Sequence, residues 1–411
     1  MGKRLAINGG PRTRSKPFTQ WPVFGREEEA ALIGALRSGK WGRYGEDECR
    51  VLQLERAFAS YCGARHCTVL TNGTIALRVA LLAAVPEEGA EVIVPPYTFQ
   101  ATATAVLENN GVPVFVDIEP DTYNIDPDKI EAAITPRTRA IIPVHFAGQA
   151  ANMDRIMDIA RRHKLIVIED AAHGHGAEYK GKRLGSIGQI GCFSFQSSKN
   201  LTSGEGGAVI TDDDRYGQLC DSIHNCGRMP DRPWYDHTML GMNFRLSEFQ
   251  AAVLLCGLAR LDEQTATRDA NGQYLNAKLS GMPGIRPMAR GQDVTRHSHH
   301  LYMFRYDAAA FGGVPRARFL EALNAEGIPC SSGYGVPLYK QGFFQKKAFG
   351  PYMASHANID YAGVKCPVCE KACAEEACWI VQQVLLGSRA DMDDIVRAIS
   401  KVYDNRKELA K

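Results

Sequence analysis

Lys199 has the clearest chemical potential of any side chain in the sequence. It lies among small hydroxylated residues, between apolar stretches at 192–195 and 208–211, and a glycine-rich turn follows it at 204–207. A solvated loop is one interpretation of this segment. A charge that only contacts water has little reason to lie between two apolar strands, however, and a lysine amine removed from water has a lowered pKa and becomes nucleophilic. The segment therefore favours a lysine that forms a Schiff base with an aldehyde.

Asp170 precedes Lys199 by 29 positions and follows the apolar run 165–168. A carboxylate there either caps the next helix or, together with a Schiff-base lysine, pairs with the protonated pyridine nitrogen of pyridoxal phosphate (PLP). Residues 71–74, Thr-Asn-Gly-Thr, open a helical stretch, where free N–H groups, hydroxyls and the helix dipole suit a phosphate. The three elements in this order indicate a PLP site.

The elements that must position these residues alternate along the first half of the chain. Short β-branched runs at 91–94, 112–116, 140–144 and 165–168 each precede polar residues and, mostly, a helical stretch. This pattern predicts an α/β fold with a mostly parallel central sheet and helices on both faces, and ligands bind at the carboxyl edge of such a sheet.

An amphipathic helix with Ser247 as its N-cap is expected to lead into a smaller α+β unit. We predict three parts: an N-terminal arm at 1–25, a large cofactor-binding domain at 26–260 and a small C-terminal domain at 261–411.

Composition excludes several classes of function. The chain has 411 residues, 45% hydrophobic and 23% charged, which is typical of a globular protein of two or three domains. Its 48 basic and 46 acidic residues leave a formal charge of +2, so neither a nucleic-acid nor a membrane partner is expected. The N-terminus lacks the apolar run of a signal peptide, and the twelve cysteines are scattered as reduced, buried thiols are. These features predict a cytoplasmic protein.

Four cysteines gather near the C-terminus, and their order matches no standard metal or iron–sulfur pattern, so we expect no metal site; they are Cys366, Cys369, Cys373 and Cys378.

Five ordered motifs resemble those of the DegT-type sugar and cyclitol aminotransferases, a PLP-dependent family of fold type I. The resemblance covers nearly the whole chain, and its motifs lie at residues 71–77, 94–99, 169–177, 193–207 and 241–245.

The resemblance implies a role for each matching residue. Lys199 would carry the cofactor and move the proton, Asp170 would bind the pyridinium nitrogen, and Phe99 would stack on the ring. Gly73, Thr74 and Ser194 would hold the phosphate, together with the backbone of Asn72, which replaces the family's usual serine. His173 stands where the family commonly has glutamine, near the cofactor's ring oxygen, and its charge state is open. Asn243 would reach the phosphate of a neighbouring subunit, so the resemblance also implies a homodimer with shared active sites. Substrate contacts are expected from His299, Tyr302, Arg245 and Tyr334.

The expected activity is transfer of an amino group from glutamine or glutamate to a keto cyclitol or keto sugar, with pyridoxamine phosphate as the intermediate form of the cofactor. Three segments resemble the branch that acts on scyllo-inosose-like ketones: residues 41–44, 195–199 and 224–228. The alternatives are an aminotransferase for nucleotide-linked 4-keto sugars, a dehydratase similar to aminohydroxybenzoate synthases, and a regulator that binds PLP without turnover.

Overall fold

The computed structural model describes residues 4–43, 49–352 and 359–409. Tyr44, the last residue of the 41–44 segment, lies outside the described residues, as do both ends of the chain. In the described part, no helix is both long and apolar enough to span a membrane.

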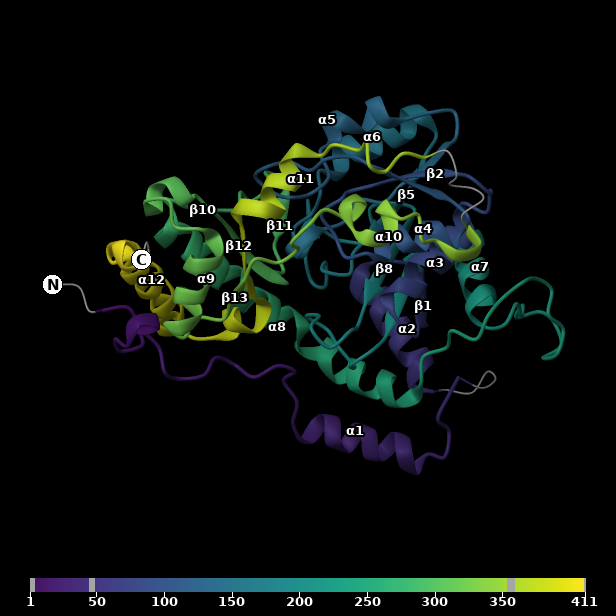
Figure 1. Ribbon diagram of the computed structural model, residues 1–411. Coiled ribbons are helices and arrows are strands. Elements are labelled where there is room, and N and C mark those ends of the chain that lie inside the picture. Colours follow the sequence, from purple (N-terminus) through teal and green to yellow (C-terminus); the bar gives the residue numbers. More distant parts are fainter. Residues whose placement is uncertain (1–3, 44–48, 353–358, 410–411) are drawn as a thin grey trace.

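A seven-stranded sheet forms the centre of the larger unit (Figure 1). Strand β9 is antiparallel to both of its neighbours, and the strands from β8 to β3 run parallel to one another. The predicted mostly parallel sheet is thus confirmed. In spatial order the strands are β1 (His66–Leu70), β9 (Gly207–Thr211), β8 (Ile190–Ser194), β5 (Ile166–Asp170), β4 (Thr138–Ile141), β2 (Glu91–Val94) and β3 (Val112–Phe115).

Alternate side chains along each strand enter opposite cores, as the period of a strand requires. In β2, Val92 and Val94 pack on one side of the sheet and Ile93 on the other. The first side is covered by α3 (Gly73–Ala84), α4 (Ala101–Glu108) and α7 (Asp214–His224). The second side is covered by α2 (Arg50–Cys62), α6 (Met153–His163) and the first half of α8. Helices therefore lie on both faces, as expected.

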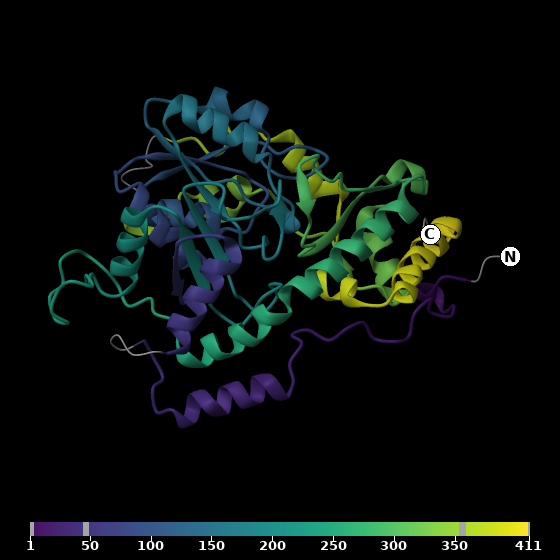
Figure 2. The same cartoon turned by 180° about the vertical axis from the view of Figure 1, so that it is seen from behind.

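Helix α8 (Glu248–Leu279) runs from the large sheet to a smaller unit, as the two opposite views show (Figures 1 and 2). Ser247 is its N-cap, as predicted. A four-stranded antiparallel sheet forms the smaller unit with α9 (Arg316–Ala325) and α12 (Arg389–Asp404); its strands are β10 (Ile285–Pro287), β12 (Leu301–Tyr306), β14 (Ala377–Val381) and β13 (Cys330–Ser331). A further small sheet joins β11 (Val294–Arg296), β6 (Glu178–Tyr179) and β7 (Lys182–Arg183).

The contacts of three segments differ from the simple division predicted from the sequence. The predicted boundary between the two domains, at residue 260, lies inside α8. Residues 338–352 and 359–372, which include α10 (Gly342–Gln345) and α11 (Pro367–Lys371), pack on the large unit. Among them, Phe344 and Tyr361 contact Phe115 of β3, and so cover the edge strand of the large sheet.

The N-terminal arm contacts the small unit, to whose core it contributes Leu5. Helix α1 (Arg26–Arg37) follows the arm and packs along α8, while the short α5 (Pro127–Ile130) lies near α6.

Candidate active site

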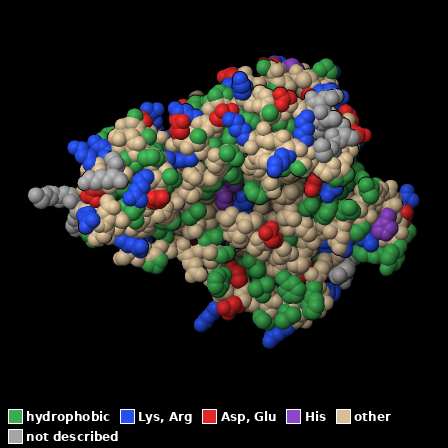
Figure 3. Space-filling view, viewed as in Figure 1, with side chains coloured by type: hydrophobic (Ala, Val, Ile, Leu, Met, Phe, Trp, Pro, Cys, Tyr) green, Lys and Arg blue, Asp and Glu red, His purple; other side chains and the backbone are tan. Residues whose placement is uncertain are grey.

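Lys199 lies in a turn between β8 and β9, near the carboxyl ends of the central strands. Burial lowers the pKa of its amine to about 8, against the opposing attraction of Asp170. A space-filling view shows a hollow between the two units, with histidine and basic side chains at its floor (Figure 3). Because its pKa is about 8, the Lys199 amine is neutral in a substantial fraction of molecules near pH 8, as a nucleophile must be.

Asp170 ends β5 and is 5% exposed. The Thr102 hydroxyl donates to its Oδ2 at 2.7 Å, and the Ala172 N–H donates to Oδ1 at 3.2 Å. Thr98 contacts the Thr102 hydroxyl at 3.0 Å, so a chain of two hydroxyls points toward the carboxylate. Burial raises the pKa of Asp170, while these hydrogen bonds and Lys199 oppose the rise. No motif in the sequence pointed to Thr102, because the contact joins the first turn of α4 to the end of β5, 68 positions away.

Glu169, next to Asp170, is fully buried on the opposite face of β5 and holds the loop after β7 in place. It accepts hydrogen bonds from the backbone N–H groups of Gly185, Ile187 and Gly188 at 2.6–2.8 Å, and its Oε2 lies 2.7 Å from His145 Nε2. Burial acts to raise its pKa, but the His145 and backbone contacts leave the pKa below its ordinary value. These contacts of Glu169, on the other face of β5, hold in place the strand end that carries Asp170.

The N-terminus of α3 meets Ser194 at the end of β8, as expected for a phosphate site. A Cβ on Gly73 would lie 2.6 Å from the Cβ of Ser194, and a Cβ on Gly207 would lie 2.4 Å from the carbonyl oxygen of Asn72. Both positions therefore require glycine. The Asn72 side chain caps the helix through the Ile75 N–H at 2.9 Å, which leaves the N–H groups of Gly73 and Thr74 for a ligand. The helix dipole and the Ser194 hydroxyl add to this anion site.

Two ring side chains flank the same strand ends. Phe99 precedes α4 and is 57% exposed, so its face is free to stack on a ligand. His173 is buried, and burial, with Lys199 and His300 nearby, lowers its pKa well below the ordinary value. The Ala147 N–H donates to His173 Nδ1 at 3.2 Å, so the proton of the neutral ring is on Nε2. His173 is thus a neutral hydrogen-bond donor.

His299 and Tyr302, from which substrate contacts are expected, both pack against α8. His299 stacks on His297 at 3.7 Å and packs against Gly272 of α8. The Tyr302 hydroxyl donates to Asn276 of α8 at 2.9 Å. The backbone of His299 has φ +44°, which breaks the extended alternation before β12 and turns the next residue toward the site.

That next residue is His300, which sequence reasoning missed. Its ring lies 4.1 Å from the ring of His173, and its Nδ1 lies 3.2 Å from the side-chain oxygen of Asn200. The signal in the sequence was that His300 is adjacent to His299, but no pattern indicated which of the two histidines faces the site.

Tyr334 lies in an aromatic cluster with Tyr97, Phe146 and Trp379. Burial raises the pKa of its phenol, with Asp170 as a further cause, which places the ring near the site.

Arg245 donates to the side-chain oxygen of Asn225 at 3.0 Å, beside the end of β1. The backbone of Asn243 forms an isolated β-bridge with that of Asn225, and Asn243 is exposed in a projecting loop between α7 and α8. These two residues thus lie at the rim of the large unit, and the structure brings neither into contact with Lys199.

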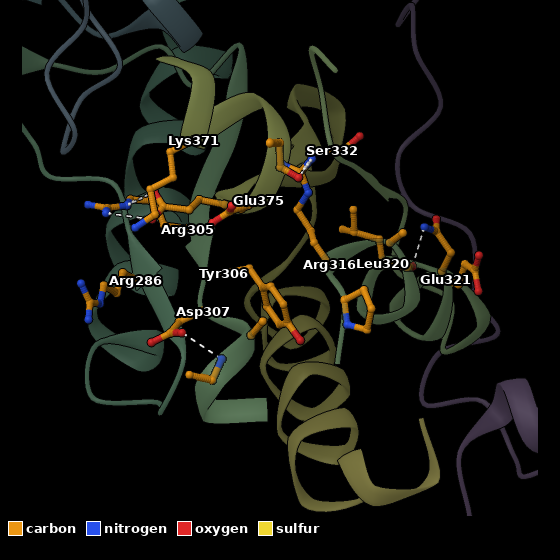
Figure 4. Close-up of a pocket in the computed structure, with 17 residues that line it drawn as sticks. Arg286, Arg305, Tyr306, Asp307, Arg316, Leu320, Glu321, Ser332, Lys371 and Glu375 are labelled. Atoms are coloured by element: carbon orange, nitrogen blue, oxygen red, sulfur yellow. Dashed lines mark hydrogen bonds and ion pairs between the residues drawn. The ribbon is translucent and has the colours of Figure 1, made fainter. Parts of the chain in front are cut away.

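A cavity of about 980 Å³ lies elsewhere, in the small unit (Figure 4). None of the residues just described lines it. Glu376 pairs there with Arg305 at 3.0 Å and with Lys371 at 2.7 Å, and Arg316 donates to backbone carbonyls at the end of α11. Three of the cations that line the cavity, Arg305, Arg316 and Lys371, are thus held by the protein's own groups.

Comparison with known proteins identifies the family of this chain. Residues 22–385 match the model of the DegT/DnrJ/EryC1/StrS aminotransferase family. The chain belongs to this family. It is 38% identical over 425 residues to an L-glutamine:2-deoxy-scyllo-inosose aminotransferase of Streptoalloteichus tenebrarius, with all of both chains covered.

Two solved structures extend the comparison. A 3-amino-5-hydroxybenzoic acid synthase has a TM-score of 0.84 and 35% identity, over 95% of this chain and 100% of that one. NtdA from Bacillus subtilis, with bound cofactor PMP, has a TM-score of 0.80 and 27% identity, over 96% of this chain and 87% of that one.

This member of the DegT/DnrJ/EryC1/StrS family is a PLP-dependent aminotransferase, and the residues present fit that cofactor. The close approach of Gly73 to Ser194 leaves a helix N-terminus open to a phosphate, and the buried Asp170 and the amine of Lys199 lie at neighbouring strand ends.

Proposed function

We propose that this aminotransferase moves an amino group from glutamine or glutamate to a keto cyclitol or keto sugar of the scyllo-inosose type. The observation that carries the proposal is the amine of Lys199, with its lowered pKa, beside the buried carboxylate of Asp170. The similarity to a cyclitol aminotransferase along the whole chain supports the choice of ketone.

When bound, PLP supplies an aldehyde that links to an amine and a pyridine ring that draws electrons from the adjacent carbon. Lys199 would hold the cofactor through its amine and, once released, would move a proton between the substrate carbon and C4′ of the cofactor in each half-reaction. Asp170 keeps a proton on the pyridine nitrogen through its negative charge. Gly73, Thr74 and Ser194 bind the phosphate, and Phe99 stacks on the ring.

His173 donates a hydrogen bond from Nε2 toward the ring oxygen of the cofactor. Since its pKa lies well below the ordinary value, the ring stays neutral across the physiological range, and it orients the cofactor without adding a charge.

The presence of Lys199 argues against two alternatives. One is a pyridoxamine-dependent sugar dehydratase, a class separate from the aminohydroxybenzoate synthases, whose relatives lack this lysine. The other is a regulator without turnover, which has no need of an enclosed nucleophile beside a buried carboxylate. The likeness to the 3-amino-5-hydroxybenzoic acid synthase keeps a dehydrating reaction as the second candidate.

A two-step experiment tests the activity. Borohydride reduction and peptide mapping are expected to place a pyridoxyl label on Lys199, whereas a label on Lys180 or Lys182 contradicts the assignment. The enzyme converted to its pyridoxamine form is then offered scyllo-inosose, 2-deoxy-scyllo-inosose, a nucleotide-linked 4-keto sugar and an aminohydroxybenzoate precursor in turn. We expect the cyclitol ketones to restore the original absorbance fastest, and fastest recovery with the nucleotide sugar contradicts the proposed ketone.

We further propose a homodimer in which Asn243 completes the phosphate site of the partner subunit. The loop that carries Asn243 exposes large apolar side chains, including Tyr235 and Leu240, which are 83% and 86% exposed. Hydrophobic side chains also gather on the lower face, over α1 (Figure 3). Leu36 of this helix is 50% exposed. Exposed apolar surface of this extent marks an interaction site.

Mixing of two inactive variants tests the shared site. Lys199→Ala and Asn243→Ala chains, once exchange of subunits is established by mass spectrometry, should form heterodimers with one complete site each. Recovery of activity above both parents supports the arrangement, and no recovery after proven exchange contradicts it.

A further inference from the structure

Asn200, the residue after Lys199, makes two side-chain contacts that none of the roles above uses. It is 2% exposed. Its Nδ2 donates to the carbonyl oxygen of Ser298 at 2.8 Å, and its Oδ1 lies 3.2 Å from His300 Nδ1. Since the amide nitrogen is the group that donates to Ser298, Oδ1 is an acceptor, and His300 must donate from Nδ1. The two contacts fix both ends of the amide.

Residues 298–300 are in turn attached to the other side of the site. The Ser298 hydroxyl donates to the carbonyl oxygen of His173 at 2.9 Å, and the Ser298 N–H donates to the carbonyl oxygen of Gly148 at 3.1 Å. The His300 ring packs on the His173 ring. One short segment therefore holds Asn200 on one side and His173 on the other.

The same segment leads directly into β12, the strand of the small sheet that pairs with both β10 and β14. The position of the Lys199 backbone is thus tied to the small unit through Asn200. A lysine has four rotatable methylene groups, so the location of its amine depends on how firmly its own backbone is held.

We propose that Asn200 is a positioning residue that holds the Lys199 backbone against residues 298–300, so that the amine returns to one place in both half-reactions. The proposal rests on the proposed role of Lys199. Displacement of a reacting group by about 1 Å can cost on the order of 10²-fold in rate, so the loss of this contact should be visible in turnover.

Asn200→Ala removes both contacts, and Asn271→Ala is the matched control. Asn271 is a buried asparagine of α8 whose amide donates to the carbonyl oxygens of Leu385 and Gly387, both at 2.8 Å, and it joins α8 to the small unit without touching the Lys199 turn. Both variants lose two side-chain hydrogen bonds of a buried asparagine. A general loss of stability should therefore affect both, and an effect on Lys199 only the first.

We expect Asn200→Ala to lower kcat by roughly 10- to 100-fold with a small change in the KM for glutamine, because the contact acts on the reacting amine and not on substrate binding. Asn271→Ala should keep both constants. His300→Phe keeps a ring against His173 but cannot donate to Asn200, so it should lower kcat in the same direction. Its effect should add little to that of Asn200→Ala, because Asn200→Ala already removes the contact that His300→Phe breaks.

A second measurement uses the cofactor-free protein. The rate at which cyanate modifies Lys199, followed by peptide mapping against pH, reports the pKa of the amine. Burial holds this pKa near 8. Release of the backbone lets water reach the amine, so the pKa should rise in Asn200→Ala, and a rise of about one unit slows modification at pH 8 roughly fivefold.

Two results would overturn the proposal. The first is an Asn200→Ala protein that loses thermal stability as Asn271→Ala does but keeps the wild-type kcat and modification profile. The second, which applies even if Asn200→Ala does not fold, is a folded His300→Phe protein with both quantities unchanged. If the pyridoxyl label instead maps to another lysine, the proposed function fails, while the modification profile still reports whether Asn200 positions Lys199.

Discussion

Thr102→Val removes the hydroxyl that donates to Asp170 and keeps the shape of the side chain. Thr102 is fully buried, and its bond to the carboxylate is 2.7 Å long. A hydrogen bond to a charged group contributes about 1.5–3 kcal/mol. At 1.36 kcal/mol for each pKa unit, its loss should raise the pKa of Asp170 by about 1–2 units, in the same direction as burial already does.

The sign of the pH dependence follows from this rise. PLP binding in the proposed arrangement requires ionised Asp170, and a higher pKa means that the ionised form is reached only at higher pH. The affinity of Thr102→Val for PLP should therefore be roughly 10- to 100-fold below wild type at low pH, and the difference should narrow as the pH rises above the new pKa.

The assay is a titration of cofactor-free protein with PLP, followed by absorbance at several pH values from about 5.5 to 8.5. Thr102→Ser keeps the hydroxyl and is the control that should bind as wild type does. If Thr102→Val binds PLP with the wild-type pH dependence, or if its loss of affinity is the same at every pH, the hydroxyl does not control the charge of Asp170.

Three further predictions concern neighbouring groups. Glu169→Gln should lower the melting temperature by several degrees, because the amide cannot accept all four hydrogen bonds. Since the folded pKa of Glu169 is lowered, the carboxylate contributes its full stabilisation above the unfolded pKa near 4.3 and loses it as the pH falls below that value, so the melting temperatures of the two proteins should converge in acid. His173→Gln should keep most of the turnover and leave the pH–rate profile between about pH 6 and 8 unchanged, because the neutral histidine does not titrate there. If the variant lacks an ionisation that the wild-type profile shows in that range, His173 does titrate there. Cys366, whose thiol pKa burial raises to about 12, should resist alkylation at pH 8 in the folded protein and react after unfolding, as mass spectrometry of the labelled peptide would show.

The sequence predicted those parts of the site that depend on local pattern. Asp170 and Ser194 are polar residues at the ends of apolar strand runs, and Gly73 lies at a helix start, so the residue pattern alone places each at the carboxyl edge of the sheet. Their mutual distances follow from the parallel arrangement of the strands.

The parts that could not be predicted depend on contacts between distant segments or on one backbone angle. Thr102 and Asn200 reach partners 68 and 100 positions away. His299 and His300 are adjacent, and only the left-handed backbone at His299 decides which of them faces Lys199. The sequence also did not predict that residues 338–352 and 359–372 pack on the large unit, because their aromatic side chains would suit either core.

The pairing of β1 with β9 has a consequence for how the protein is made. Leu70, at the end of β1, pairs with Gly207, so about 140 residues must leave the ribosome before this part of the sheet can close. At about 5–20 residues per second, that takes roughly 7–28 s. The start of α3 can meet Ser194 and the backbone of Gly207 only after this delay, so a nascent chain that ends before Gly207 lacks part of the proposed phosphate site. Loading with PLP is therefore a late event in biosynthesis, and a chain stalled before that point exposes the unpaired edge of β1 to aggregation.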